Sequence, residues 1–266
     1  MSIKSKLKRN LMKKNEKFSM LNPKNQRKKD FSYIKMIDEY WDNSIGSNVD
    51  KLKSFTKYVP FSEFPKFLAK YEIFKKIITV NGSIIECGVH QGSGLMTWAL
   101  LSSIFEPVNH LRKIFGFDTF EGFPELSQFD EVENNLNAKI GGLSVNSHDD
   151  ILESIKIYDT FRPLGHISKV KLIKGDANKT IEYFINKNPH LIISLLYLDF
   201  DIYKPTKKAI EKLRKRMPKG SIIAFDELNH EDWPGETIAL METLGVNNLK
   251  IERFPFHPQI SYAILD

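Results

Sequence analysis

Acidic side chains follow four apolar segments of this 266-residue chain, at positions where they could bind a nucleotide and a cation. If the segments are parallel strands, their carboxyl ends meet at one edge of a sheet, where open α/β sheets bind ligands. Carboxylates accept hydrogen bonds from ribose hydroxyls and also bind hard divalent cations. The acids are Asp118, Asp176, Asp199 with Asp201, and Asp226 with Glu227.

A glycine-rich turn precedes all of these acids, within the sequence ECGVHQGSG of residues 86–94. An apolar strand pattern leads into the turn, and a helical pattern over 95–105 follows it. Glycines let the backbone approach a ligand closely, and the N–H groups of a helix N-terminus then face that ligand. The candidate cofactor-binding residues of this turn are Glu86, Gly88, Gly92, Ser93 and Gly94.

The turn and the next two acids together indicate an adenosine site. Asp118, followed by Thr119, is placed to accept hydrogen bonds from ribose hydroxyls, and Asp176, followed by Ala177, lies at the same edge. Asp176 equally fits the N-cap of the helix that follows it. Glu86 suits a positively charged methionyl amino group, which a nicotinamide dinucleotide lacks. The predicted cofactor is therefore S-adenosyl-L-methionine (SAM).

The last two acidic positions predict a metal site. Asp199 and Asp226 are 27 residues apart, an interval that holds one helix and one strand, so a right-handed crossover returns both to the same edge. Carboxylates brought this close repel one another unless they are protonated or bridged by a cation. An all-oxygen set suits Mg²⁺, Ca²⁺ or Mn²⁺, and we predict Asp199, Asp226 and Glu227 as ligands, with Mg²⁺ favoured. The alternative is that Asp201 and Glu227 cap helices or face water.

A cation at this edge would help an acceptor hydroxyl to lose its proton and would orient it toward the sulfonium methyl. Methyl transfer is an in-line displacement, so alignment in a water-poor site supplies much of the rate. An aliphatic hydroxyl still needs a base. Asp199 is the first candidate for this base, followed by His148 and then by His166 and His230.

The elements that position these residues follow from hydrophobic patterning. Apolar runs separated by amphipathic helices indicate parallel strands covered on both faces, hence a doubly wound α/β fold of the Rossmann-like kind. A helical cap is predicted over residues 31–80 and the main domain over 81–266. The last two apolar segments predict a closing antiparallel pair. The five predicted parallel strands are 83–89, 113–117, 170–174, 191–200 and 221–225, and the closing pair is 249–254 with 261–265.

Charge is distributed unevenly along the chain. Residues 1–30 hold eleven Lys and Arg against Glu16 and Asp30 and therefore carry a charge of +9. Because the net charge of the whole chain is +6, the remainder is mildly acidic. This segment predicts a solvated, flexible tail, with contact to RNA, acidic lipid or a subunit as alternatives. It lacks the apolar region of a signal peptide, and no run is long enough to span a membrane. The single cysteine, Cys87, excludes a disulfide framework and favours a cytoplasmic protein.

At these residues the sequence resembles the macrocin (TylF-like) sugar O-methyltransferase family, closest to its calicheamicin TDP-rhamnose 3-O-methyltransferase branch. The resemblance implies a seven-stranded class I SAM-dependent fold, with Asp118 at the SAM ribose and Asp176 at the adenine edge. It also implies a divalent cation held by Asp199, Asp226 and Glu227, although Asp226-Glu227 here replaces an Asp-Asp pair. The matching stretches are 86–94, 106–107, 116–124, 199–207, 219–227 and 233–236.

The resemblance implies methylation of a hydroxyl of a nucleotide-linked deoxysugar, a TDP-6-deoxyhexose with the 3-hydroxyl as one candidate, or of a related glycoside. A histidine that some of these enzymes use as base has no counterpart in residues 129–146, a segment that we interpret as a mobile lid. We also expect a homo-oligomer, because the aromatic-rich segment 55–74 could be buried against a second subunit.

Two other functions compete on motifs alone. Tyr203 and Lys207 have the spacing of a short-chain dehydrogenase pair, and Gly88, Gly92 and Gly94 match its glycine pattern. Their positions argue against a dehydrogenase, because the glycines follow eighty residues of chain and Pro205 separates the pair. The basic tail suggests a nucleic-acid methyltransferase or binding module, which the acidic remainder disfavours. We therefore expect no nucleic-acid and no membrane partner.

Overall fold

The computed structural model describes residues 28–133 and 135–266 and divides into two compact units. The first unit extends to Tyr58 and the second begins at Val59, with residues 134–137 grouped with the first. The predicted basic tail lies outside the described residues up to position 27. Within the described part of the chain, no helix is long and apolar enough to cross a membrane.

The described part of the first unit, from residue 28 on, consists of two helices and a short 3₁₀ turn: α2 (Lys28–Asn43), α3 (Asn48–Lys53) and Phe55–Lys57. Ser47 begins α3 with a capping box, in which its hydroxyl accepts from the Asp50 amide and the Asp50 carboxylate accepts from the Ser47 amide. The ring of Tyr58 packs edge-on against Trp41, with 4.8 Å between the ring centroids. Capping and aromatic packing thus stabilise this small unit.

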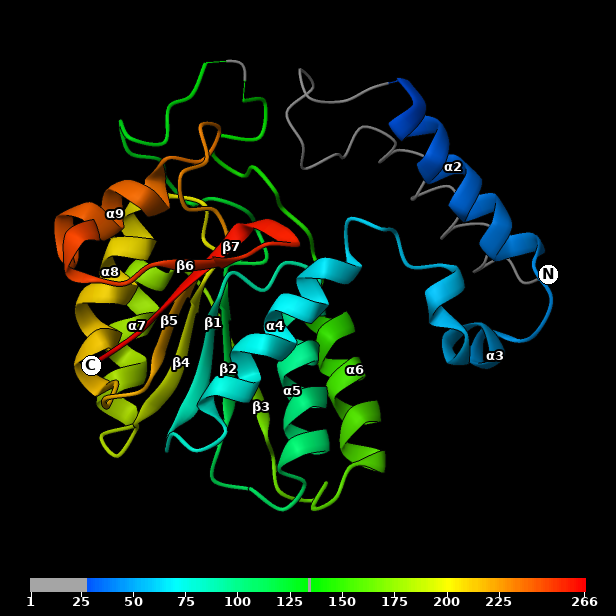
Figure 1. Ribbon diagram of the computed structural model, residues 1–266, viewed down its shortest axis with the longest axis horizontal. Helices are drawn as coiled ribbons and strands as arrows, with labels where there is room; N and C mark the ends of the chain where they lie inside the picture. The colour runs from blue at the N-terminus through cyan, green and yellow to red at the C-terminus, as the bar shows by residue number, and fades with distance from the viewer. Residues whose placement is uncertain (1–27, 134) are drawn as a thin grey trace. The chain divides into compact units, whose positions relative to one another are not determined.

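The second unit is built on a seven-stranded sheet with the order β3-β2-β1-β4-β5-β7-β6 (Figure 1). The first five strands along the chain are parallel, and β7 is antiparallel to both β5 and β6. The predicted doubly wound sheet and its closing antiparallel pair are therefore confirmed. The strands are β1 (Ser83–Cys87), β2 (Ile114–Asp118), β3 (Val170–Lys174), β4 (Ile193–Leu198), β5 (Ile222–Phe225), β6 (Glu252–Phe254) and β7 (His257–Ile264).

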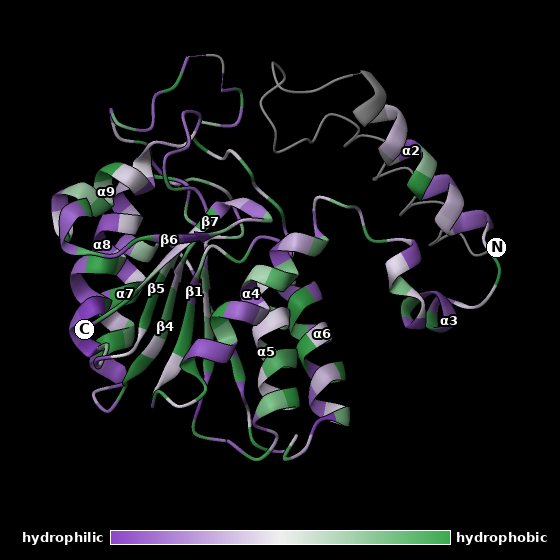
Figure 2. Cartoon of the chain, viewed as in Figure 1, coloured by the Kyte–Doolittle hydropathy of each residue, from purple (hydrophilic) through white to green (hydrophobic). Residues whose placement is uncertain are grey.

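Helices cover both faces of this sheet (Figure 1). The apolar colouring of Figure 2 runs along the central strands and the helix faces turned toward them, as two-sided burial requires. Of the predicted cap over 31–80, α4 belongs to the second unit, where it packs on α5 and β7. One face carries α4 (Phe64–Ile77), α5 (Ser93–Phe105) and α6 (His148–Phe161), and the other α7 (Ala177–Lys187), α8 (Tyr203–Leu213) and α9 (Gly235–Thr243).

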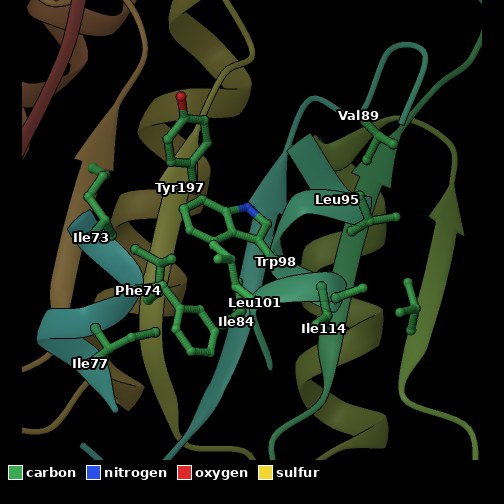
Figure 3. Close-up of a cluster of buried hydrophobic side chains, with 14 of the residues drawn as sticks. Ile73, Phe74, Ile77, Ile84, Val89, Leu95, Trp98, Leu101, Ile114 and Tyr197 are labelled. Carbon is green, nitrogen blue, oxygen red and sulfur yellow. The ribbon is translucent and has the colours of Figure 1, made fainter. Parts of the chain in front are cut away.

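Two hydrophobic cores lie on the two faces, and β1 contributes to both. Ile84 packs in the core beneath α4 and α5, whereas Ile85 and Cys87 pack in the core beneath α7 and α8. The fully buried Trp98 and Tyr197 are neighbours in the first core (Figure 3), with ring centroids 5.6 Å apart. Because the side chains on both faces of the strands are buried, the strands are continuous apolar runs in the sequence and do not alternate between apolar and polar residues.

The strand order reverses between β1 and β4, since β2 lies on one side of β1 and β4 on the other. The loops after these two strands leave the sheet in opposite directions, which opens a crevice at the carboxyl edge of a doubly wound sheet. This is the edge at which the predicted glycine turn and acids meet.

Candidate active site

The glycine turn after β1 lies against the residue that follows β4. The Asp199 amide donates to the Cys87 carbonyl at 2.7 Å, which brings the two strand ends together. Gly88 has φ of +92°, and a Cβ placed on it would lie 1.8 Å from the Asp199 carbonyl oxygen. A side chain cannot occupy this position without moving the backbone, so the sequence requires glycine here.

Asp118, at the end of β2, fixes the conformation of the same turn. Its Oδ2 accepts from the amides of Val89 and His90, both at 2.8 Å, and its Oδ1 accepts from the amide of Phe120 at 2.6 Å. Sequence reasoning placed Asp118 at this edge as a ribose acceptor but did not foresee that it organises the glycine turn. Its position between the turn and the sheet edge is compatible with both tasks.

Glu86 points from β1 into the face covered by α4 and α5, and it is 2% exposed. Its Oε1 accepts from Lys70 Nζ at 3.3 Å, while Oε2 has no hydrogen-bond partner among the described residues. Burial raises the pKa of Glu86 to about 7, although Lys70 opposes this increase. A buried carboxylate oxygen without a partner is the feature expected of a ligand-binding group.

The remaining predicted cofactor residues lie along the same edge. Asp176 caps α7, since its Oδ1 accepts from the Asn178 amide at 2.9 Å, and Ala177 is buried as the first residue of that helix. The Thr119 hydroxyl donates to the Gly122 carbonyl at 2.7 Å and therefore serves its own loop. Gly92 precedes α5 with φ of +86°, and Ser93 is the first residue of the helix.

Five carboxylates gather after β4 and β5 and at the start of α9: Asp199, Asp201, Asp226, Glu227 and Glu236. All but the partly exposed Asp199 are buried. The Tyr197 hydroxyl donates to Asp226 Oδ1, and the Glu227 amide donates to Glu236 Oε2 at 3.2 Å. Glu236, which is fully buried, therefore ties α9 to the loop after β5; its importance was not foreseen from the sequence.

The electrostatics of this cluster are those of crowded, desolvated anions. Burial raises the pKa of Asp199 well above its usual range, and Asp226 and Asp201 raise it further. Burial likewise raises the pKa of Asp201 to about 6 and that of Glu227 well above its usual value. The carboxylates thus compete for a limited number of protons, which is the condition under which a cation stabilises such a site.

The side chain of Lys66 faces this cluster of carboxylates. No group of three His, Cys, Asp or Glu side chains in residues 28–133 and 135–266 already has the arrangement of a metal site. Burial alone would lower the pKa of Lys66, but Asp226, Glu63 and Asp199 attract its ammonium and raise the pKa overall. The donor set nevertheless fits a hard cation, because all its atoms are carboxylate oxygens and Glu227 Oε2 is buried without a partner among the described residues.

The structure separates the candidate histidines. His148 begins α6, stacks edge-on against Phe120 and has its Nδ1 2.9 Å from Asp149 Oδ1. His166 precedes β3 and so lies toward the opposite edge of the sheet, whereas His230 follows β5 and accepts from the Asp232 amide through Nδ1.

No pattern in the sequence singles out His257, which lies at the acidic edge. It begins β7, and the pairing of Phe225 with Ser261 carries the start of β7 past the carboxyl end of β5. The side chain is buried, and its Nδ1 accepts from the Ile260 amide at 3.2 Å. Burial lowers the pKa of His257, while Asp226 acts in the opposite direction. The neutral ring therefore carries its proton on Nε2, as a donor.

Four non-glycine residues with left-handed backbone follow four of the five parallel strands whose carboxyl ends meet at this edge. They are His90, Phe120, Asp201 and Asn229, after β1, β2, β4 and β5, with φ between +49° and +63°. Residues of this kind cluster at functional sites, because the surrounding structure must hold each in an unfavourable conformation. Sequence patterns do not reveal them, since Phe120 in particular is not a residue that prefers this region.

The segment predicted as a lid is anchored at several points. Asp130 is buried, and its carboxylate accepts from the amides of Ser127 at 2.8 Å and Tyr203 at 2.7 Å. Phe123 packs with Ile202 and Trp233 in a small third core, which joins the loops after β2, β4 and β5. These contacts anchor the described part of the segment at Phe123 and Asp130, and its role as a lid stays a prediction.

The dehydrogenase-like pair forms a polar network away from the glycine turn. Lys207 Nζ donates to the Tyr203 hydroxyl at 2.8 Å and to Glu242 of α9 at 2.7 Å, and the tyrosine hydroxyl also donates to Glu242. These contacts join α8 to α9. Neither side chain is thereby placed as a hydride-transfer group, and the motif match is a coincidence of spacing.

Comparison with known proteins agrees with this geometry. The model of the family described as macrocin-O-methyltransferase (TylF) matches residues 71–240. A crystal structure of the calicheamicin methyltransferase CalS11 is 30% identical, covers 90% of this chain and 94% of its own, and superimposes with a TM-score of 0.86. An apo structure of CalS11, described as a TDP-rhamnose 3'-O-methyltransferase, is 28% identical over 90% of this chain and 96% of its own, with a TM-score of 0.78.

A more distant structure shares the fold. The O-methyltransferase NovP is 17% identical over 75% of this chain and 79% of its own, with a TM-score of 0.57. A sequence search of curated proteins gave no match.

Proposed function

Because the chain belongs to the macrocin O-methyltransferase (TylF) family and is thus a SAM-dependent O-methyltransferase, we propose that its acceptor is a hydroxyl of a nucleotide-linked deoxysugar and that a divalent cation assists the transfer. One observation carries the proposal: a buried cluster of carboxylates adjoins the glycine turn at the carboxyl edge of β4 and β5. Such a cluster is electrostatically costly unless its charge serves a ligand.

The cofactor half of the site consists of the turn and the acids around it. SAM supplies an electrophilic methyl group on a sulfonium. We assign Glu86 to its ammonium, Asp118 and Thr119 to the ribose, and Asp176 and Ala177 to the adenine. The close backbone approach at Gly88 holds the turn against the end of β4, and we assign Gly88, Gly92, Ser93 and Gly94 to contact the cofactor along this turn.

The acceptor half consists of Asp199, Asp226 and Glu227, which would hold the cation. The cation, for which Mg²⁺ is the first choice, supplies charge that lowers the pKa of a bound hydroxyl. The residues themselves provide an oxygen-only donor set. Tyr197 orients Asp226 by donating to Oδ1, and Asp201 interacts electrostatically with Glu227. The ligands are thus supported by neighbours that fix their orientation.

The base that removes the hydroxyl proton is assigned to Asp199. Its pKa is raised by burial and by Asp226, so it binds a proton more readily than an ordinary aspartate. His148 is the second candidate, because it lies at the start of α6 against Phe120 in the loop after β2.

The sugar acceptor is inferred from similarity. One CalS11 structure is described as a TDP-rhamnose 3'-O-methyltransferase and spans nearly the whole of this chain. We extend that class of acceptor, a TDP-6-deoxyhexose or a related glycoside, to this chain. The small core of Phe123, Ile202 and Trp233 provides an apolar support for the loops that would surround the sugar. A homo-oligomeric, cytoplasmic enzyme remains our prediction from the sequence.

Methyl transfer to a panel of TDP-6-deoxysugars, followed by mass spectrometry, tests the proposal. Transfer is expected to stop in excess EDTA and to return when Mg²⁺ is restored. Asp199→Asn should lower kcat by about 10²-fold or more, the usual effect of losing a general base. Glu211→Gln, an exposed carboxylate on α8, is the matched control and should keep full activity.

Each part of the proposal has its own contradicting result. Full turnover in EDTA would exclude the metal, and full activity of Asp199→Asn would exclude this residue as base. If no member of the panel is methylated although SAM binds, the acceptor class is wrong.

A further inference from the structure

A buried ion pair lies directly behind the glycine turn, between Lys70 of α4 and Glu86 of β1. The Nζ and Oε1 atoms are 3.3 Å apart, and the two side chains are 8% and 2% exposed. Lysine is rarely buried to this degree unless it is paired, because its ammonium loses most of its hydration. The position of this pair therefore needs an explanation.

Aromatic rings hold the lysine in place. Its Nζ lies 3.4 Å from the centroid of the Tyr197 ring and 4.9 Å from that of Trp98. Figure 3 shows these two rings side by side in the core beneath α4 and α5. Cation–π contacts of this kind stabilise a desolvated ammonium and restrict its motion. The lysine head is thus fixed in position before any ligand arrives.

The start of α5 touches both members of the pair. A Cβ placed on Gly94 would lie 1.9 Å from Glu86 Oε1 and 2.9 Å from Lys70 Nζ. The absent side chain of Gly94 therefore lets the helix N-terminus and the ion pair adjoin one another. The pair therefore lies against the first residues of α5, beside the turn in which we place the cofactor.

Each member retains hydrogen-bonding capacity. Glu86 Oε2 has no partner among the described residues. An ammonium has three N–H donors, and among the described residues Lys70 donates one hydrogen bond, to Glu86. One side of the pair can accept and the other can donate, at a spacing of a few ångströms. A free α-amino acid group, with an ammonium and a carboxylate on one carbon, has the complementary arrangement.

We propose that Lys70 and Glu86 together recognise the amino acid end of the cofactor, with Glu86 Oε2 accepting from its ammonium and Lys70 Nζ donating to its carboxylate. The assignment rests on the SAM-dependent function proposed above and adds a positioning residue from α4. Lys70 thus contacts the cofactor in addition to forming an ion pair with Glu86. Through Lys70, α4, a helix outside the glycine motif, closes the methionyl end of the site.

The pair is also connected to the acceptor half. Tyr197, whose ring covers the Lys70 ammonium, donates its hydroxyl proton to Asp226. Glu86 and Tyr197 are paired across β1 and β4. Both ends of the reaction are therefore supported by one rigid group of side chains.

Binding of three adenosine ligands, measured by calorimetry at pH 8, tests the proposal. S-Adenosylhomocysteine (SAH) has both charged groups, S-adenosyl-3-thiopropylamine lacks the carboxylate, and methylthioadenosine lacks both. Wild-type protein should bind SAH at least about tenfold more tightly than the amine, the usual worth of one charge-assisted hydrogen bond. In Lys70→Met this preference should vanish, while methylthioadenosine affinity changes less than about twofold.

Two further variants separate recognition from structure. Lys70→Arg keeps the charge and should retain part of the preference, and Lys75→Met removes a neighbouring exposed lysine of α4 and should change nothing. Equal losses for SAH and methylthioadenosine in Lys70→Met would show a purely structural role and overturn the inference. So would wild-type protein that binds SAH and the amine equally, a result that needs no variant. Wild-type protein that binds none of the three ligands would instead contradict the SAM-dependent function.

Discussion

Raising the pH from 6 to 8 should strengthen SAH binding about tenfold, because Glu86 ionises in this interval. Burial raises the pKa of Glu86 to about 7; Asp226 and Asp118 act in the same direction and Lys70 acts against them. The ionised form, which attracts the ligand ammonium, grows from about one-tenth of the molecules at pH 6 to about nine-tenths at pH 8. That tenfold difference corresponds to about 1.4 kcal/mol of binding free energy.

The sign of the effect separates ionisation of a protein carboxylate from ionisation of the ligand. Loss of the proton from the ligand's own amino group would weaken binding as the pH rises, in the opposite direction. Methylthioadenosine has no amino group, so its affinity should stay constant over the same interval. The measurement is a series of calorimetric titrations with both ligands at half-unit steps of pH.

Two substitutions complete the experiment. Glu86→Gln removes the titrating group and should abolish the pH dependence while weakening SAH binding at pH 8. Glu72→Gln alters a carboxylate that pairs with Lys75 on the surface of α4, and it should leave the curve unchanged. An equal slope for methylthioadenosine, or a slope that persists in Glu86→Gln, would refute the assignment.

Three further predictions concern the acidic cluster, the start of α5 and the loop around Asp130. The pKa of Asp201 is raised to about 6 and that of Glu227 well above its usual value. The metal-free fold should therefore lose stability as the pH rises from about 5 to 8, because the folded state must then hold these carboxylates ionised. Mg²⁺ should raise the melting temperature more at pH 8 than at pH 5. Gly94→Ala should weaken SAH binding at least about tenfold in calorimetry, because the new methyl group meets Glu86 Oε1. Asp130→Ala should cost about 1–3 kcal/mol in denaturant unfolding and speed proteolysis at 131–137, because two amides lose their acceptor.

Each of these has a control and a contradicting outcome. Metal-free stability that rises between pH 5 and 8 would show that the buried carboxylates are not destabilising when ionised. Leu100→Ala, at an exposed site of α5, controls for Gly94→Ala, and unchanged SAH affinity in the latter would mean that the ion pair can move aside. Glu131→Ala controls for Asp130→Ala, and equal proteolysis of the two variants would remove the anchoring role.

Much of the fold was predictable because burial on both faces leaves a clear trace in the sequence. The parallel strands are nearly continuous apolar runs, and each acid that ends one marks the carboxyl edge. The predicted strand over 113–117 became Ile114–Asp118, a shift of one residue at each end. The closing antiparallel pair was also legible, but β6 covers only Glu252–Phe254 of the predicted 249–254, and β7 begins at His257, before the predicted segment 261–265, and includes Pro258.

The parts of the site that could not be predicted depend on contacts between distant elements. Lys70 lies on a helical pattern and reads as a surface residue until α4 is placed over β1. His257 reaches the acidic edge only through the register of β7 against β5. The hydrogen bonds from Val89 and His90 to Asp118 involve main-chain amides, which carry no sequence signal. Residue types predicted which chemistry is present, whereas tertiary pairing decides which groups cooperate.

The small core of Phe123, Ile202 and Trp233 has a consequence for engineering the enzyme. Three loops from three strands share it, so none of them is an independent module. Replacing only residues 119–147 with the loop of a relative would remove Phe123 from this core and expose part of Ile202 and Trp233, which would lower solubility as well as stability. A chimaera intended to accept a different sugar should exchange all three loops together, or keep these three side chains as fixed points and vary only the residues between them.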